Sequence, residues 1–158
     1  FRRIGLIRDP YNTGTTTVAS ADTRRQLYAA VFSSVSGTFT ADEEINQAST
    51  GAVGKVVEYD STNKILYYYQ TRFPDVGTDS DGNLTAFSGA NAITGQSSSA
   101  SATPNTSNST TTNGVVFVSG YSNPELAFDS GDIIYVEERS PITRASDQTE
   151  NIKLIIEF

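Results

Sequence analysis

The final segment of the chain places the firmest constraint on its fold. Residues 151–158 carry apolar side chains at every second position, at Ile152, Leu154, Ile156 and Phe158. A period of two is typical of a β-strand that buries one face. Because an unpaired apolar strand at a chain end would promote aggregation, we expect this strand to be docked inside a sheet.

Two more strands are predicted near the ends of the chain. Residues 133–138 are β-branched and aromatic, follow the turn signal Ser130-Gly131, and end before Pro141, which cannot donate to a ladder. Residues 1–8 form a candidate strand that stops at Asp9-Pro10. We expect residues 1–7 and 152–158 to meet in one β layer.

The clearest hairpin lies at 52–70. Valines and Tyr59 lead into the turn-rich run 60–64, and the second arm, Ile65–Tyr69, follows directly. This arm is apolar or aromatic on both faces, which predicts a central strand or one that covers an interface.

The remaining segments are less regular. Residues 11–20 are predicted to be a loop, residues 26–36 a strand preceded by a short helix or turn, and residues 115–118 a short buried strand. Residues 96–113 are mainly Ser, Thr, Asn and Ala, and predict a flexible loop or a long hairpin arm because they can bury little apolar surface.

Together these patterns predict a mainly β fold. We expect an antiparallel sheet, sandwich or small barrel with long loops and at most one or two short helices. We expect a single β domain over 1–158, in which terminal strands at 1–9 and 115–158 frame an inserted β region, 37–113, that contains the flexible loop 96–113.

An internal echo runs through the chain. Phe39 and Ile45, Phe87 and Ile93, and Phe128 and Ile134 each enclose five residues, and the first two copies continue alike with Ser and Ala at the same offsets. The spacing lies in the range of repeated supersecondary units. A true repeat and a coincidence of offsets are both open at this point.

Composition excludes several kinds of chemistry. The 158 residues suit one domain and begin at Phe1 without any Met, so we expect a fragment of a longer protein. The absence of Cys and His excludes disulfides, thiolate metal sites and Ser-His triads. A net charge of −7 disfavours nucleic-acid binding, and no apolar run approaches the ~20 residues of a membrane span. We expect no cofactor, metal, nucleic acid or membrane partner.

Few residues suggest a catalytic or metal site. Asp129 with Asp132, and Glu137 with Glu138, are carboxylate pairs to weigh for glycoside hydrolysis, but strand neighbours point to opposite faces. We therefore expect no enzyme. The run 79–83 has oxygens at alternate positions like a calcium loop, but it lacks the closing Glu, and a β-turn is expected. The pair at 24–25 predicts either solvated arginines or a partner contact.

One family resemblance rests on the two ends of the chain. The run Ser-Gly-Asp-Ile-Ile-Tyr-Val-Glu-Glu-Arg-Ser-Pro-Ile at 130–142, followed by Asp-Gln-Thr-Glu and the final strand at 147–158, resembles the C-terminus of the baseplate wedge subunit encoded by gene eight of T-even-like tailed phages. The opening residues 1–10 look like the strand that leads into this region in the family.

The resemblance implies a virion structural protein that is the C-terminal part of a baseplate wedge subunit. It implies dimerisation of the full-length protein, contacts with other wedge subunits, assembly in the host cytoplasm and a place in the tail baseplate. We expect interface residues in the connection before the final strand and on the hairpin, namely Arg139, Pro141, Arg144, Asp147, Gln148, Tyr67 and Tyr69. A turn before the final strand is the simpler interpretation of 147–150.

A carbohydrate- or receptor-binding β module is the alternative function. Loops and exposed aromatic residues on a rigid β scaffold commonly carry recognition. The contact residues would then be Tyr11, Tyr67, Tyr69 and Tyr121.

Overall fold

The computed structural model describes residues 3–20, 25–71 and 76–138, and within these ranges it contains β-strands and no α-helix. The predicted mainly β fold is confirmed, because the strands of the described residues pair antiparallel in sheets of two, seven and two strands and form no closed barrel. The strands are β1 (Arg3–Arg8), β2 (Tyr28–Val31), β3 (Glu44–Gln47), β4 (Ala52–Asp60), β5 (Ile65–Tyr69), β6 (Ile93–Gly95), β7 (Ser101–Ala102), β8 (Thr111–Thr112), β9 (Val115–Val116), β10 (Tyr121–Ser122) and β11 (Asp132–Glu138).

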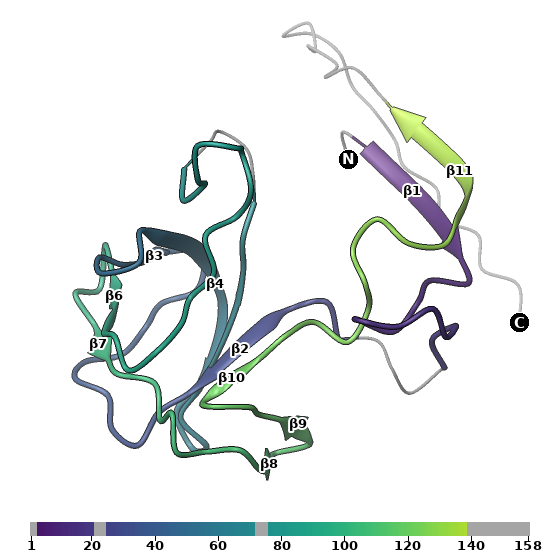
Figure 1. The fold of residues 1–158 in the computed structure, drawn as a ribbon. Helices are drawn as coiled ribbons and strands as arrows, with labels where there is room; N and C mark the ends of the chain where they lie inside the picture. Colours follow the sequence, from purple (N-terminus) through teal and green to yellow (C-terminus); the bar gives the residue numbers. More distant parts are fainter. Residues whose placement is uncertain (1–2, 21–24, 72–75, 139–158) are drawn as a thin grey trace, which may run out of the picture.

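The large sheet has the order β10-β2-β5-β4-β3-β6-β7, and β1 and β11 form a separate two-stranded ribbon beside it (Figure 1). β8 and β9 make a small hairpin of their own. The large sheet therefore includes β2 and β10, which lie outside the region 37–113 that was expected to be an insertion.

The predicted hairpin at 52–70 is confirmed, and its second arm is central. β5 pairs with β4 on one side and with β2 on the other. Alternation along β5 sends Leu66 and Tyr68 into one apolar cluster and Ile65 into a second cluster on the opposite face. Phe117, almost fully buried, fills the second cluster. Both faces of these strands are covered, which explains their nearly continuous apolar sequence.

Two copies of the internal echo form a structural repeat. The hairpins β3–β4 and β6–β7 use equivalent registers, with Ile45 opposite Gly54 and Ile93 opposite Ala102. β3 and β6 also pair with each other, with Asn46 opposite Thr94, so a local two-fold relates the hairpins through that pair. The Phe of each of these two copies is buried in the same cluster. The third copy, at 128–134, does not belong to the repeat, because its Phe and Ile are exposed.

Two buried polar side chains tie the repeated hairpins together. The carboxylate of Glu43 accepts hydrogen bonds from the backbone amides of Thr40 (2.7 Å) and Ser98 (2.9 Å) and from the hydroxyls of Ser97 and Ser98. Burial by itself would raise the pKa of Glu43, but these hydrogen bonds outweigh it and lower the pKa from 4.5 to about 2. The echo places Asn91 at the equivalent position of the second copy, so the two copies share geometry and differ in chemistry.

Gln47, at the end of β3 in the same hairpin as Glu43, makes the second polar connection, to the segment that precedes β6. Its amide nitrogen donates to the carbonyl of Asn91 (2.8 Å), and its amide oxygen accepts from the backbone of Ser88 (2.9 Å) and the hydroxyl of Thr50 (2.9 Å). The equivalent position is Gly95, where an added Cβ would lie 2.6 Å from the Glu43 carboxylate. Both polar atoms of the fully buried Gln47 amide thus have hydrogen-bond partners, so its burial leaves no polar group unpaired.

Three predicted segments differ from the structure. The strand expected over 26–36 is limited to β2, and the helix or turn expected before it falls partly on residues outside the described ranges. The segment 96–113 contains β7 and β8, and Ala100 and Ala102, at and next to β7, are buried in the first apolar cluster. The strand expected at 115–118 buries only alternate residues, and Val116 and Val118 face outward.

Candidate assembly surface

The ribbon pairs two segments that are far apart in the sequence. β1 runs antiparallel to β11, with Leu6 opposite Tyr135 and Ile7 opposite Ile133, and the register shifts between Leu6 and Ile7. Both strands were predicted. Residues 152–158, which were expected to meet the N-terminal strand in one β layer, lie outside the described residues, and the observed partner of β1 is β11.

A tight approach fixes the base of the ribbon. Gly131 has a φ of +85°, and an added Cβ there would lie 2.6 Å from the carbonyl oxygen of Arg8. The guanidinium of Arg8 donates to the carboxylate of Asp132 at 3.0 Å. Since both charged groups are largely exposed, this pair sets register more than it adds stability.

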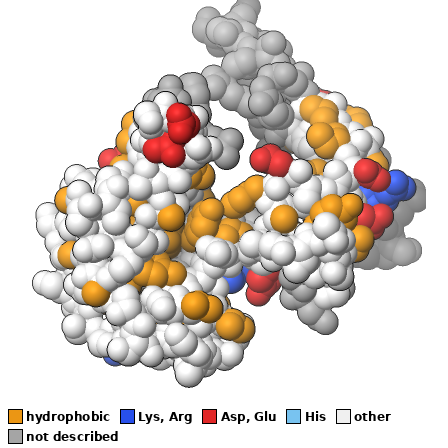
Figure 2. Space-filling model, in the orientation of Figure 1, with side chains coloured by type: hydrophobic (Ala, Val, Ile, Leu, Met, Phe, Trp, Pro, Cys, Tyr) orange, Lys and Arg blue, Asp and Glu red, His pale blue; other side chains and the backbone are white. Residues whose placement is uncertain are grey.

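The ribbon exposes apolar side chains on both faces. Ile133 is 69% exposed and Leu6 is 52% exposed, and their strand neighbours behave in the same way. The exposed apolar residues of the two strands are Ile4, Leu6, Ile7, Ile133, Ile134, Tyr135 and Val136. Figure 2 shows apolar side chains gathered over this part of the molecule. A contiguous exposed apolar surface of this kind marks an interaction site.

A hollow of about 410 Å³ adjoins the ribbon. It is lined on one side by Ile7 and Pro10 and on the other by Leu126, Ala127 and Phe128. Phe128 also contacts Tyr28, the first residue of β2 in the large sheet, with ring centroids 6.1 Å apart. We call this space the ribbon hollow; it could receive an apolar side chain from a neighbouring protein.

Arg25 holds the ribbon side of the molecule to the large sheet. Its guanidinium donates to the hydroxyl of Ser122 (2.7 Å) and to the carbonyl of Asn123 (2.8 Å), and also reaches the carbonyl of Leu27. Its backbone amide donates to the carboxylate of Glu125 (3.0 Å). Burial lowers the pKa of Arg25, while the charge of Glu125 acts in the opposite direction. Arg25 is therefore neither a solvated residue nor a free partner contact, and Arg24 lies outside the described residues.

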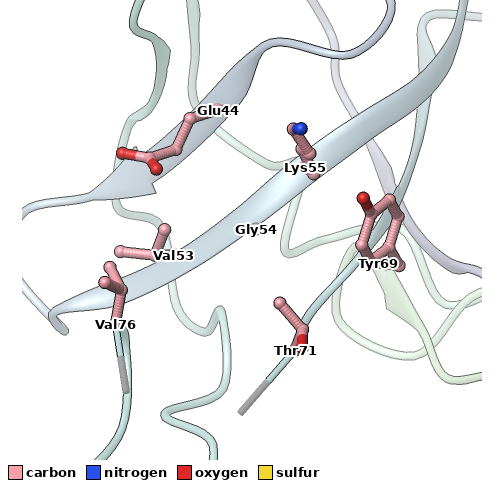
Figure 3. Close-up of a pocket in the computed structure, with 7 residues that line it drawn as sticks. All are labelled: Glu44, Val53, Gly54, Lys55, Tyr69, Thr71 and Val76. Carbon is pink, nitrogen blue, oxygen red and sulfur yellow. The ribbon is translucent and has the colours of Figure 1, made fainter. Parts of the chain in front are cut away.

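A second hollow, of about 350 Å³, lies on the face of the large sheet (Figure 3). Glu44, Lys55 and Tyr69 are neighbours across β3, β4 and β5 and form a polar row along it. Tyr69 is 38% exposed there. Of the predicted interface residues, Tyr69 is thus placed at a surface hollow.

The other predicted site residues are placed differently. Tyr67 is half-buried against the second apolar cluster. Tyr121 packs on the opposite face of the sheet, where its hydroxyl donates to the carbonyl of Gly89 at 2.8 Å. Tyr11 lies in the loop after β1, so the structure does not gather the four candidate tyrosines into one platform. The five predicted residues of the connection, Arg139, Pro141, Arg144, Asp147 and Gln148, lie outside the described residues.

Two of the carboxylates that were weighed as sites, Asp132 and Asp79, make structural contacts. Asp132 pairs with Arg8, and Asp79 accepts hydrogen bonds from the backbone amides of Asp81 and Asn83. These two bonds hold the run 79–83 as a turn. Within the described ranges, no three His, Cys, Asp or Glu side chains form a group that could hold a metal ion, and no helix has the length and hydropathy to cross a membrane.

Sequence reasoning missed the exposure of the ribbon. Its alternating apolar residues predict strands, and the same residues would be expected inside a core. No local signal separates the two cases, because Ile65–Tyr69 is also apolar on both faces and lies in the core of the large sheet.

Fold and surface together define a class of protein. The chain is a β-structured protein with a self-supporting sheet and a separate apolar ribbon of the kind that contacts other proteins. A family model described as "Bacteriophage T4, Gp8" matches residues 62–158, more than half of the chain, so the chain belongs to this family of phage baseplate wedge proteins. Neither a curated protein nor a solved structure matches the chain.

The match confirms the resemblance and changes its extent. It includes β5 to β11 and the residues that follow, and so takes in 62–113, where no family motif was noted. Residues 1–61, including β1, lie outside it. The family is one of structural proteins of the phage baseplate, which assemble with other baseplate proteins in the virion.

Proposed function

We propose that this chain is the C-terminal part of a wedge subunit, and that it acts without catalysis by docking to neighbouring wedge subunits through the β1–β11 ribbon. The observation that carries the proposal is the exposure of Ile133 and its neighbours in a member of a baseplate family. The large sheet would serve as a rigid base. The protein would assemble in the host cytoplasm and function in the virion.

The physical argument is the cost of leaving this surface in water. Fully burying one Leu, Ile or Val side chain is worth roughly 1.5–3 kcal/mol, and the ribbon presents several such residues side by side. A partner that covers one face of the ribbon and inserts a side chain into the ribbon hollow would gain from most of them. Many moderate contacts then sum in a symmetric assembly.

The connection 139–150 begins where β11 ends, so it would border the same interface. Arg139 and Arg144 offer planar forks for carboxylates of a partner, and Pro141 favours an extended backbone. The partner expected from this chemistry has an apolar centre with acidic groups at its rim. The candidate partners are a second copy of the full-length subunit and the other wedge subunits.

Reconstitution with the other wedge subunits tests the proposal. Replacing Leu6 and Tyr135, which face each other across the ribbon, by Glu should weaken binding by about tenfold or more, because charge at the centre of an interface is costly. The control is Val116→Glu with Val118→Glu, since these valines are at least as exposed but lie away from the ribbon. Both proteins should keep the circular dichroism spectrum and urea midpoint of the parent. Equal binding by the two would contradict a role for the ribbon.

The predicted connection is tested in the same assay. Arg139→Ala with Asp147→Ala should weaken wedge assembly and leave the fold intact. Unchanged assembly in a pull-down would remove these residues from the interface without affecting the case for the ribbon.

A carbohydrate- or receptor-binding role is the second candidate, and Tyr69 is the observation that favours it. Its exposed ring lies beside Lys55 and Glu44 in the sheet hollow, and aromatic rings beside polar groups suit sugars. A glycan array with the parent and Tyr69→Ala distinguishes the two functions. Saturable binding that Tyr69→Ala abolishes would support recognition and count against a purely structural role.

A further inference from the structure

The turn between β8 and β9 contains the one Asn-Gly pair of the sequence, Asn113-Gly114. Thr112 lies opposite Val115 in this hairpin, so the pair forms the whole of its loop. Both residues have a positive φ, +48° at Asn113 and +77° at Gly114, as a two-residue turn of type I′ requires. Both are exposed, and Figure 1 shows the hairpin away from the ribbon.

The side chain of Asn113 and the backbone of Gly114 can react with each other. Glycine has no Cβ to obstruct the approach of its backbone nitrogen to the side-chain amide carbon of Asn113. Attack by this nitrogen forms a carbon–nitrogen bond that closes a succinimide ring. The bond from the same carbon to Nδ2 breaks, and ammonia leaves with the proton of the Gly114 N–H. Water then opens the ring at one of its two carbonyls and leaves aspartate or isoaspartate at position 113.

The hairpin is small enough to permit the attack. To close the ring, Asn113 must leave its turn conformation, so the loop has to open first. β8 and β9 contribute only two residues each to their ladder. Short exposed ladders open at a small free-energy cost. The reaction is therefore accessible to the folded chain.

The amide that would be lost has a structural role. Nδ2 of Asn113 donates to the carboxylate of Asp60 at 3.3 Å, which joins the hairpin to the turn between β4 and β5. The same carboxylate also accepts from the backbone amides of Thr62 and Asn63. Deamidation would replace the donor of Asn113 by a second carboxylate, and like charges that face each other repel.

We propose that Asn113 is a site of spontaneous deamidation, and that its modification detaches the β8–β9 hairpin from the turn between β4 and β5. Val115 and Phe117, which follow the turn, are buried in the second apolar cluster. A loosened hairpin would therefore uncover part of one face of the large sheet. The only co-reactant is water. The proposal is independent of the ribbon and of wedge assembly.

Peptide mass spectrometry of the chain after incubation in mildly alkaline buffer tests the reaction. Asn113 should deamidate at least about tenfold faster than Asn63 and Asn83, which also lie in turn segments but precede residues that carry a Cβ. Gly114→Ala should slow the reaction at position 113. The comparison among the three asparagines of one chain holds even if Gly114→Ala disturbs the turn. Deamidation of Asn113 no faster than that of Asn63 and Asn83 would overturn the proposal.

Hydrogen exchange tests the structural consequence. Asn113→Asp mimics the product, and Asp tolerates a positive φ as Asn does. This substitution should speed exchange of the Phe117 amide, which donates to the carbonyl of Thr110 at 3.0 Å, by about fivefold or more and leave the β3 amides unchanged. In an Asp60→Asn background its effect should be smaller, because no carboxylate then faces the new charge. No effect, or an equal effect in both backgrounds, would contradict the proposed detachment.

Discussion

The large sheet and the ribbon use the same kinds of residue in opposite ways. In the large sheet, Ile65 and Leu66 are fully buried on opposite faces of one strand. In the ribbon, Ile133 and Ile134 are mostly exposed on a strand of similar composition. The difference shows that an apolar sequence pattern predicts a β-strand. It does not predict whether other residues of the same chain bury the apolar side chains of that strand.

The polar groups of the two regions differ in the same sense. Glu43 and Gln47 in the large sheet are buried and satisfied by several hydrogen bonds each. The charged pair of the ribbon, Arg8 and Asp132, remains exposed. The large sheet therefore has a closed interior whose polar groups are hydrogen-bonded, whereas the ribbon leaves both its apolar side chains and its charged pair exposed.

A matched pair of side-chain truncations tests the contrast between the large sheet and the ribbon most strongly. Leu66→Ala should lower the free energy of unfolding by about 2–5 kcal/mol, because it leaves a cavity in a closed core. Ile133→Ala in the free chain should change it by about 0.5 kcal/mol or less, because its side chain is already in water. Urea unfolding monitored by circular dichroism measures both. Equal losses would mean that the ribbon belongs to the folding core.

The pH dependence of stability tests the role of the buried carboxylate of Glu43. Because its pKa is about 2 in the folded chain and 4.5 unfolded, ionised Glu43 contributes about 3 kcal/mol above pH 4.5. That stability is lost progressively as the pH falls from about 4.5 toward about 2. Glu43→Gln should lower stability at neutral pH by about 2–3 kcal/mol and flatten the acid dependence in this window.

The neighbouring substitution Glu44→Gln is the control for this prediction. Glu44 is exposed on the same strand pair, so its replacement should change the unfolding midpoint little. An acid profile that Glu43→Gln leaves unchanged would assign the pH dependence to other carboxylates.

Two glycines compare the regions at the backbone level. Gly95→Ala should destabilise the chain by about 1–3 kcal/mol, since the new Cβ would lie 2.6 Å from the carboxylate of Glu43. Gly5→Ala in the ribbon should have little effect, because the nearest atom to its Cβ would be the carbonyl oxygen of Tyr135 at 4.0 Å. Thermal unfolding of the two variants measures the contrast. A larger loss of stability for Gly5→Ala than for Gly95→Ala would contradict the assignment of the large sheet as the rigid region.

The sequence predicted those parts of the fold whose signals are local. The hairpin of β4 and β5 was found because its turn residues and apolar arms are contiguous. β1 and β11 were found for the same reason, but their pairing was not, since it joins distant segments. β7 and β10 have two residues each and no periodicity to detect, and they are strands only because the larger sheet supplies their partners.

The candidate site was less predictable than the fold. A buried carboxylate such as Glu43 looks like a surface residue in the sequence, because its burial depends on donors that lie more than 50 positions away, at Ser97 and Ser98. In the sequence, only the repeat marked the position of Glu43, because it aligns Glu43 with Asn91. The ribbon is exposed because none of the described residues covers its apolar side chains, and no local pattern in the sequence records this.

Hydrogen exchange in the free chain and in the reconstituted wedge tests the central claim most directly. The account predicts that the β1 and β11 amides exchange faster than those of β5 in the free chain and become markedly protected in the wedge, while β5 is protected equally in both. Ribbon amides that exchange at the same rate in the free chain and in the wedge would contradict the claim that the ribbon is the surface completed by assembly.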